Sequence, residues 1–346
     1  MKIVVSLIIF SIIILFHELG HFLLAKRAGI KVNEFSLGLG PTIVGFQRGE
    51  TLYSLKLLPF GGACMMEGED EDSSAENSFG SKSVWARISV VAAGPVFNFI
   101  MAFVFSFIII CATGYDLPVL VDVTPGYAAA EAGLQAGDVI TEMNGKNIHF
   151  YRDISAYGMY HAGEPVIVTY ERDGKEYTTE LVPKFDEELG RYLYGFIGSP
   201  GRAKYTNNVF SLLKYSVYEV GYWIDSTVQS LRLLVTGGVS VNDMSGPVGI
   251  VDAIGDSYEE SVSYGVGVAV LQMMYICVFL SANLGVMNLL PIPALDGGRL
   301  VFLIIEAIRG KKINPEKEGI VHFIGLVLLL LLMVVIMFND VRKLFI

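Results

Sequence analysis

The chain has 346 residues, 53% of them hydrophobic, and a mean hydropathy of +0.52. Soluble domains contain roughly 45–50% apolar residues spread along the sequence. Here the apolar residues are concentrated in four long runs, which excludes an ordinary soluble protein. The net charge of −10 argues against a nucleic-acid partner, because such proteins carry a basic surface.

The four apolar runs cover residues 2–25, 84–112, 264–290 and 321–338. Each is close to the ~20 residues that cross a bilayer as a helix. The first run has no small-residue cleavage site and contains polar residues, so we interpret it as a retained span rather than a signal peptide. The sequence therefore predicts an α-helical membrane protein with about four transmembrane helices and a lipid bilayer as its surroundings.

We divide the chain into eight segments on this pattern. The transmembrane helices are predicted at 1–28, 84–113, 261–298 and 321–341. Between them we expect a membrane-reentrant β-region and a cytoplasmic loop at 29–83, and an extracytoplasmic module at 114–200. An amphipathic extracytoplasmic linker at 201–260 and a cytoplasmic segment at 299–320 complete the division.

Residues 32–62 alternate apolar and polar side chains with glycine between them, which predicts short strands and hairpins. The stretch is too apolar for a free loop, and we expect it to enter the membrane beside the first span. Non-helical backbone at that depth must pack against protein or a wet cavity. The acidic stretch 66–83 is predicted to be a solvated loop. In the second span, the small residues Ala92, Ala93 and Gly94 predict close helix packing.

The module at 115–198 contains short strand-like runs around an alanine-rich helical stretch. Asn144-Gly145 and Asp173-Gly174 are hairpin-turn signals, so we expect a small, mostly β fold. Residues 207–235 predict an amphipathic helix at the outer membrane surface, and the glycine-rich residues 237–250 predict a loop. The three cysteines form no CxxC pair, so we expect neither a disulfide nor a thiolate metal site.

Lysine and arginine cluster in two loops, beside four span ends, and this sets the expected orientation. They follow the first span, precede the second, and lie between the third and fourth. Loops rich in these residues face the cytoplasm. We therefore expect both of these loops in the cytoplasm, and the acidic insert and both termini outside.

His17, Glu18 and His21 lie within the apolar first span, in the stretch ILFHELGHFLLAKR. Residues four apart share one helix face, so both imidazoles can hold one ion, and neutral imidazole suits zinc. His-Glu-x-x-His on a helix is the pattern of two ligands and a general base. The metal lowers the pKa of bound water towards ~7. A chance match inside a span would cost several kcal/mol, so we predict one Zn²⁺ ion here.

A catalytic zinc site needs a third protein ligand, and Asp296 is the candidate. It follows Pro291 and Pro293, which break the third span. At 1.5 Å per residue, His21 lies about 9 Å deeper than Arg27 at the headgroup level, and Asp296 lies at a matching level. The alternative for Asp296 is a helix N-cap.

Two asparagines complete the set of candidates drawn from the residues. Asn288 precedes the prolines and is expected to donate to a developing oxyanion or to hold the substrate backbone. Asn98 lies in the middle of the second span, where a polar side chain serves either helix packing or substrate handling.

The motifs HELGH and NLLPIPALDGG together resemble the site-2 protease family of intramembrane zinc metalloproteases, in particular its bacterial RseP-like branch. GPVFN and LPFGGACMMEGED resemble two further stretches of that branch, and VTPGYAAAEAGLQAGDVITEMNGKNI resembles its PDZ domains. The resemblance implies zinc ligation by His17, His21 and Asp296, and Glu18 as catalytic base.

The resemblance also implies substrate contacts and a function. It implies Asn288 near the substrate, a β-region that pairs with unwound substrate, Gly61 and Gly62 in that contact, and a PDZ-like domain at 114–200. The expected activity is cleavage of transmembrane segments of single-span proteins, such as anti-sigma factors and remnant signal peptides, in the bacterial cytoplasmic membrane. The active site would lie in the cytoplasmic half of the bilayer.

Two other functions are compatible with parts of the sequence. A catalytically silent membrane scaffold would use the PDZ-like domain alone, but the intact Glu18 argues against it. A metal transporter would place ionisable residues at several levels along several spans, whereas here they gather at one level. Whether the PDZ-like domain binds peptides or screens out bulky substrates is left open by the sequence, with screening favoured.

Overall fold

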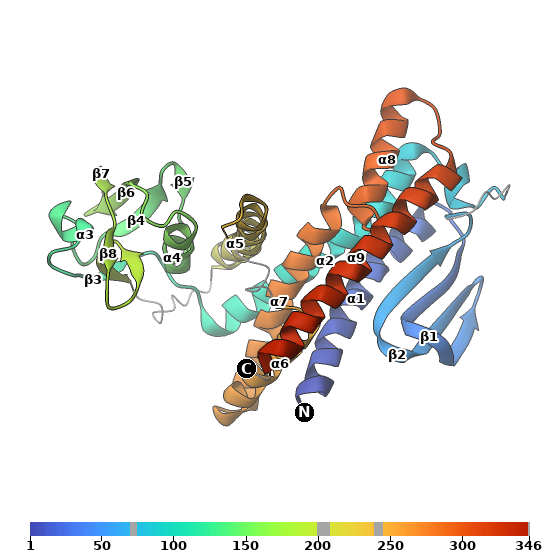
Figure 1. Ribbon diagram of the computed structural model, residues 1–346, viewed down its shortest axis with the longest axis horizontal. Coiled ribbons are helices and arrows are strands. Elements are labelled where there is room, and N and C mark those ends of the chain that lie inside the picture. Colours follow the sequence, from blue (N-terminus) through green and yellow to red (C-terminus); the bar gives the residue numbers. More distant parts are fainter. Residues whose placement is uncertain (70–74, 199–207, 239–244, 345–346) are drawn as a thin grey trace. The chain divides into compact units, whose positions relative to one another are not determined.

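The computed structural model describes residues 1–69, 75–198, 208–238 and 245–344 (Figure 1). The chain forms two compact units. The first comprises Met1–Phe105 and Thr236–Ile346, and the second comprises Ser106–Val235. Parts of the predicted acidic loop, linker and glycine-rich loop, at 70–74, 199–207 and 239–244, lie outside the described residues.

Within the described residues, four helices are long and apolar enough to cross a membrane, which confirms the prediction of four spans. They are α1 (Lys2–Arg27), α2 (Val84–Thr113), α7 (Val266–Leu289) and α9 (Pro315–Leu344). Helix α1 ends on two basic residues, which interact favourably with the partial negative charge of a helix C-terminus. Helix α7 ends just before Pro291, which cannot donate a helical hydrogen bond.

Helix α1 packs against α2, α6 and α7 through one narrow stripe of its surface. The buried residues of α1 recur at helical spacing and lie on one face: Ser6, Ile9, Ile13, His17, Gly20, His21 and Ala25. At Gly20 the two backbones are so close that an added Cβ would clash with the Ala93 carbonyl. The close packing predicted from the small residues of α2 is therefore confirmed, and it brings α2 against the two histidines.

One long, bulged hairpin forms the β-region. Strands β1 (Val32–Arg48) and β2 (Thr51–Met66) pair antiparallel, and each is bent back on itself. Residues 34–37 therefore pair with 52–55 on one side and with 62–65 on the other, while 44–48 pair with 51–55. The base of the hairpin packs with α1, α2 and α8 in a core cluster that contains Ile30, Cys64 and Phe79, the last in a short 3-10 turn (Phe79–Ser81). Its far half exposes large apolar side chains, among them Ile43, Val44, Phe46 and Leu57, as expected for a hairpin in contact with lipid.

Two helices of the first unit were not predicted. Helix α8 (Asp296–Arg309) fills the first half of the expected cytoplasmic segment and is joined to α2 by a buried ion pair between Glu306 and Arg87. Helix α6 (Pro247–Ser263) begins inside the stretch predicted to be a loop. Its N-terminus is capped by Asp340 of α9, whose carboxylate accepts the Gly246 and Gly249 backbone N–H groups at 2.9 and 3.0 Å.

The second unit holds a small module of short strands and helices. Its strands are β3 (Leu120–Val123), β4 (Val139–Met143), β5 (Lys146–Asn147), β6 (Val166–Arg172), β7 (Lys175–Leu181), β8 (Lys184–Asp186), β9 (Arg191–Leu193) and β10 (Phe196–Gly198). Its helices are α3 (Ala128–Glu131) and α4 (Tyr151–Tyr160). The largest sheet has the order β5-β4-β6-β7, and β3 pairs with β10. Asn144 and Asp173 have positive φ and are followed by glycines of positive φ, as the turn prediction required.

Helix α5 (Val209–Thr236) packs against this module. Glu219 of α5 pairs with Arg152 of α4, and Asp225 pairs with Lys146. The Tyr115 and Tyr215 rings stack with their centroids 3.6 Å apart. The predicted helix at 207–235 is thus present as a partner of the module.

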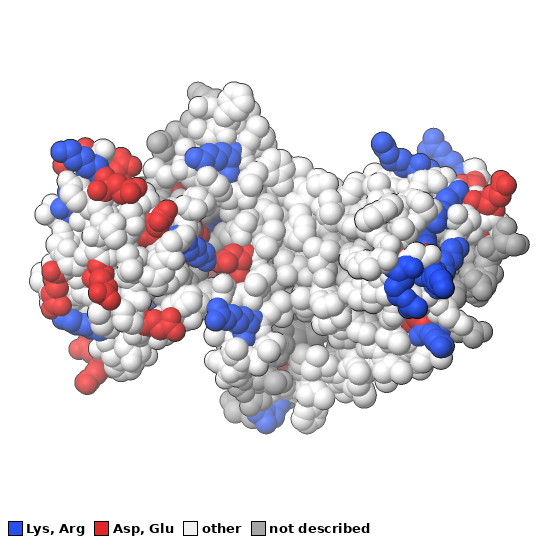
Figure 2. Space-filling view, turned by 90° about the horizontal axis from the view of Figure 1, so that it is seen from above, with Lys and Arg blue, Asp and Glu red and all other residues white. Residues whose placement is uncertain are grey.

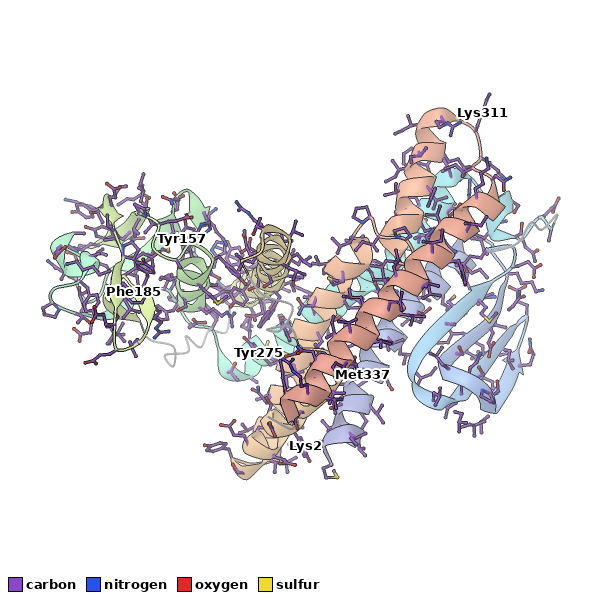
Figure 3. The ribbon with its side chains drawn as sticks, viewed as in Figure 1. Lys2, Tyr157, Phe185, Tyr275, Lys311 and Met337 are labelled. Carbon is purple, nitrogen blue, oxygen red and sulfur yellow. The ribbon has the colours of Figure 1, made fainter. Side chains whose placement is uncertain are left out.

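Charge separates the two ends of the first unit. Lysine and arginine side chains gather at the end that carries α8, next to a surface of uncharged residues (Figure 2). Lys311, between α8 and α9, marks this end, and Lys2 lies at the opposite end (Figure 3). Lys2 pairs there with Asp252 and Asp256 of α6, and the last turn of α9 lies at that end as well (Figure 1).

Candidate metal centre

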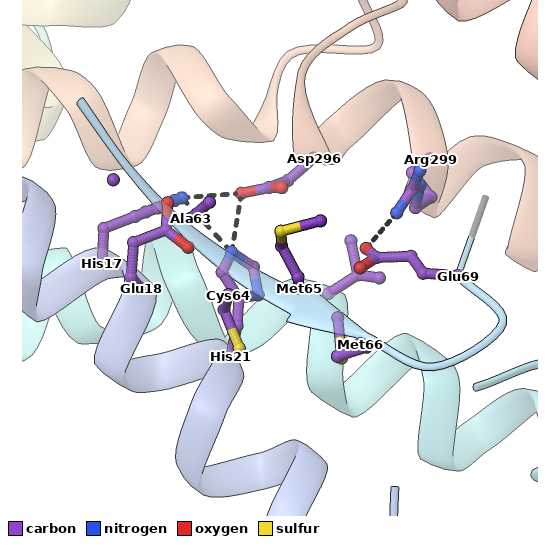
Figure 4. A pocket seen from close by; sticks show the side chains of 12 residues that line it. His17, Glu18, His21, Ala63, Cys64, Met65, Met66, Glu69, Asp296 and Arg299 are labelled. Carbon is purple, nitrogen blue, oxygen red and sulfur yellow. Dashed lines mark hydrogen bonds and ion pairs between the residues drawn. The ribbon is translucent and has the colours of Figure 1, made fainter. Parts of the chain in front are cut away.

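Three side chains from two helices place ligand atoms at one point. His17 and His21 are one turn apart on α1, and Asp296 is the first residue of α8 (Figure 4). Their ligand atoms all lie within 4.8 Å of one another. Asp296 Oδ2 is 3.2 Å from His17 Nε2 and 3.6 Å from His21 Nε2, and the two Nε2 atoms are 3.3 Å apart.

These separations fit one tetrahedral zinc ion. Zinc–ligand bonds of about 2.0–2.1 Å in a tetrahedron place neighbouring ligand atoms about 3.3–3.4 Å apart. Asp296 Oδ2 is buried and has no hydrogen-bond partner, which is costly for a carboxylate oxygen unless it binds a cation. Leu295, not Asp296, is the N-cap of α8. The N-cap alternative is therefore wrong, and the carboxylate points at the histidines.

Backbone and amide groups of α2 hold the far side of each imidazole. His21 Nδ1–H donates to the Val90 carbonyl oxygen at 2.8 Å, which leaves Nε2 unprotonated for a metal. His17 Nδ1 lies 3.2 Å from Asn98 Nδ2, while the fully buried Asn98 has an unpartnered Oδ1. A half-turn of the amide exchanges its oxygen and nitrogen and lets Oδ1 accept the His17 proton. Asn98 therefore contacts a ligand, and its geometry favours positioning of His17.

Gly94 gives the imidazoles their space. A Cβ at this position would clash with His21 Nε2 and lie 2.6 Å from His17 Cε1. Pro95 follows and removes one helical hydrogen bond of α2. The GPVFN stretch therefore supports the metal centre in two ways: Gly94 leaves room for the imidazoles, and Asn98 contacts His17. These two roles do not involve contact with a substrate.

Glu18 and Asn288 border the open side of the centre. Glu18 is half-buried and lines the pocket that contains the three ligands. Asn288, in the last turn of α7, has its Nδ2 3.4 Å from His17 Nε2. Both side chains are therefore within reach of groups that occupy the space in front of the ligand atoms.

Strand β2 forms a wall of this pocket, and of its lining residues only Gly62 was a candidate from the sequence. The lining residues from β2 are Gly62, Ala63, Cys64, Met65 and Met66. Gly62 sits against α1, because an added Cβ would lie 3.2 Å from Glu18 Cγ. Gly61 instead packs against Leu39 of β1 and has a φ of +85°. Cys64, which is buried, lines the pocket from this strand.

An ion pair between Glu69 and Arg299 forms the rim of the pocket (Figure 4). Glu69 follows β2, and Arg299 lies in the first turn of α8. Neither was singled out in the sequence, because a charge beside a span end is an ordinary feature of a membrane protein.

Comparisons with known proteins agree with this arrangement. Peptidase family M50 matches residues 5–332. Zinc metalloprotease RasP of Geobacillus kaustophilus is 33% identical over 425 residues, which cover 99% of this chain and 98% of that protein. The regulator of sigma-W protease RasP of Bacillus subtilis is 33% identical over 426 residues and 99% of each chain. A solved PDZ domain of the SdrC-like protein from Listeria monocytogenes is 23% identical, has a TM-score of 0.21, and covers 25% of this chain and 87% of that chain.

Proposed function

This chain belongs to peptidase family M50 and is a zinc metalloprotease of the membrane, and from that premise we propose that it cleaves transmembrane segments of single-span membrane proteins. The observation that carries the proposal is the meeting of His17, His21 and Asp296 beside Glu18 on an apolar span. A site at that depth is accessible to peptide bonds that lie within the bilayer.

The residues of the site have different roles in amide hydrolysis. His17, His21 and Asp296 would hold the zinc ion, which supplies Lewis acidity to the carbonyl and makes water nucleophilic near neutral pH. Glu18 takes a proton from the attacking water and delivers it to the leaving amine as the C–N bond breaks. Asn288 donates from its amide to the carbonyl oxygen as negative charge develops there.

Strand β2 is suited to hold the substrate in an extended form. Among the described residues, 62–66 of β2 pair on one side only, with residues 32–37 of β1. Residues 52–55 of β2, in contrast, pair on both sides, with 34–37 and with 44–47. The half of β2 with the unpaired edge is the half that lines the pocket. A substrate helix shields its amides by hydrogen bonding and must unwind before attack. Pairing of the unwound segment along β2 would satisfy its backbone groups inside the membrane.

Charge distribution supports an orientation with the α8 end in the cytoplasm. The last turns of α1 and α8 are basic, and cytoplasmic loops carry such residues. The centre then lies in the cytoplasmic half of the bilayer, and the inserted PDZ-like module lies outside. We assign the protein to the bacterial cytoplasmic membrane because the relatives that it matches over nearly their full length are bacterial.

The proposed substrates are anti-sigma factors and remnant signal peptides. The printed name of the Bacillus subtilis relative, regulator of sigma-W protease, supports the first class. Both kinds of substrate are short on the outer side once trimmed. We propose that the inserted module excludes proteins with large outer domains, as a step in regulated intramembrane proteolysis.

A cleavage assay with Glu18→Gln tests the proposal. A tagged single-span substrate without its outer domain is incubated in detergent with the wild type or the variant, and zinc is measured in both. Loss of a general base lowers the rate by about 10²–10⁴-fold, while the ligands stay intact. We expect a smaller fragment with the wild type alone and about one zinc per chain in both proteins.

Two results would contradict the proposal. Equal cleavage by both proteins would remove Glu18 from the chemistry. No cleavage and no bound zinc in the wild type would favour the silent scaffold, whose working part would be the inserted module.

A further inference from the structure

His322 of α9 contacts the loop that delivers Asp296. This loop, residues 290–295, connects α7 to α8. The Ala294 N–H donates to His322 Nδ1 at 2.9 Å. A side chain 28 residues away in sequence thus holds the backbone two residues before a metal ligand.

The loop has few hydrogen bonds of its own with which to hold its shape. Pro291 and Pro293 have no N–H to donate. Ile292 N–H and Leu295 N–H donate within the loop, to Leu290 O and Ile292 O. The Ala294 N–H has no acceptor within the loop and donates instead to His322 of α9.

Ala294 adopts a conformation that requires such support. Its φ is +76°, in the left-handed region that is unfavourable for a residue with a Cβ. Strained backbone persists when the surroundings determine it. The bond from Ala294 to His322 holds the backbone in this conformation, and the next two residues, Leu295 and Asp296, begin α8.

Helix α9 also packs directly on the loop. A Cβ at Gly325 would lie 2.5 Å from Pro293 Cβ and 2.6 Å from Pro293 O, so the helix backbone touches the loop one turn after His322. On the far side of the imidazole, Glu318 Oε1 lies 3.9 Å from Nε2, which favours the proton on Nε2 and leaves Nδ1 as the acceptor. The Phe302 ring of α8 is 5.6 Å from the imidazole, centroid to centroid.

These contacts are notable because α9 is otherwise little buried. In the most apolar 18-residue stretch of α9, 6% of the residues are buried, compared with 28% in the corresponding stretch of each of the other three spans. We propose that His322 is a positioning residue of the zinc centre: its Nδ1 fixes Ala294, and thereby the carboxylate of Asp296, in the geometry that binds the metal. This inference rests on the zinc centre proposed above.

The test is zinc affinity in three His322 variants of the full-length protein in detergent. Asn places its Oδ1 where Nδ1 lies, Gln places an acceptor near Nε2, and Leu has none. Each protein is stripped of metal and titrated with Zn²⁺ against a chromophoric chelator. Loss of a group that orients a ligand weakens metal binding about 10–100-fold, so we expect this in His322→Leu and His322→Gln. In His322→Asn we expect an affinity within about threefold of the wild type.

A second readout separates positioning from packing. Cobalt(II) replaces zinc, and its visible absorption reports the ligand geometry; we expect a changed spectrum in His322→Leu and the wild-type spectrum in His322→Asn. All variants lose the packing of the imidazole on Phe302, so a merely structural role would lower the unfolding temperature in each without separating Asn from Leu. Phe323→Leu, at an exposed neighbouring position, is the matched control and should behave as the wild type.

Several outcomes would overturn the inference. Wild-type zinc affinity in His322→Leu would do so, as would equal weakening in His322→Asn and His322→Leu. If His322→Leu fails to fold, His322→Asn is compared with His322→Gln instead, and equal zinc affinities of these two variants would overturn the inference. A wild-type protein that binds no zinc would refute the metal centre itself, which is a different failure.

Discussion

Gly94 shows how a missing side chain shapes the metal centre. Its Cα faces the two imidazoles, and a methyl group there would overlap His21 Nε2. Replacing Gly94 with Ala therefore forces both rings away from Asp296. We expect the zinc content to fall from about one ion per chain to a small fraction, with an overpacking cost of about 1–3 kcal/mol in stability. Metal analysis of the purified protein measures the first effect.

Gly267 provides the matched control for this substitution. It lies in the first turn of α7, and an added Cβ would meet nothing within 4 Å. Gly267→Ala makes the same chemical change in a helix, so it should retain full zinc. A Gly94→Ala protein with full zinc content would show that the imidazoles have another low-energy arrangement.

At the scale of elements, α6 depends on a residue far away in the chain. Asp340 of α9 caps it through the Gly246 and Gly249 N–H groups. Asp340→Ala removes this cap, which typically costs about 1–2 kcal/mol. Local opening of α6 should then become about tenfold more frequent. Hydrogen exchange of the peptide covering 247–263 should accelerate accordingly. Arg342→Ala changes an exposed residue on the same helix, and unchanged exchange in it would tie the effect to the cap.

The same contacts explain what could and could not be predicted from the sequence. The spans were predictable because a run of about 20 apolar residues is a sufficient signal. The pair His17 and His21 was recognisable because helical spacing is local. Helix α6 was not, since its cap comes from Asp340. A β-region in contact with substrate at Gly61 and Gly62 was implied by the family resemblance. Cys64 and Met65 were not candidates, since only the folded hairpin places them in the pocket wall.

Asp296 is intermediate between these cases. The proline break before it was visible in the sequence, and so was its suitability as a ligand. Its actual position depends on packing, because Gly297 and Gly298 let α8 start directly against the carbonyls of Leu290 and Ile292. Tertiary contacts of this kind leave no periodic pattern, so the ligand was identifiable but its support was not.

At the scale of the whole molecule, the proposed orientation makes a labelling prediction. Leu189 is 59% exposed on the inserted module, and Lys311 is exposed between α8 and α9. Single cysteines at these positions are introduced after the native Cys64, Cys111 and Cys277 are replaced by alanine. Basic loops stay in the cytoplasm. A membrane-impermeant maleimide should therefore label position 189 in intact cells with the outer surface accessible, and position 311 only after the membrane is permeabilised.

Each labelling site is the experimental control for the other. Both are exposed in the structure, so both should react in detergent, and only the membrane separates them. Labelling of position 311 from outside, with position 189 protected, would show that the protein has the opposite orientation in the membrane. The metal centre would then lie in the outer half of the bilayer, and the inserted module could no longer screen substrates by the size of their outer domains. The orientation thus determines which end of a single-span substrate the inserted module can contact before the peptide bond is cleaved.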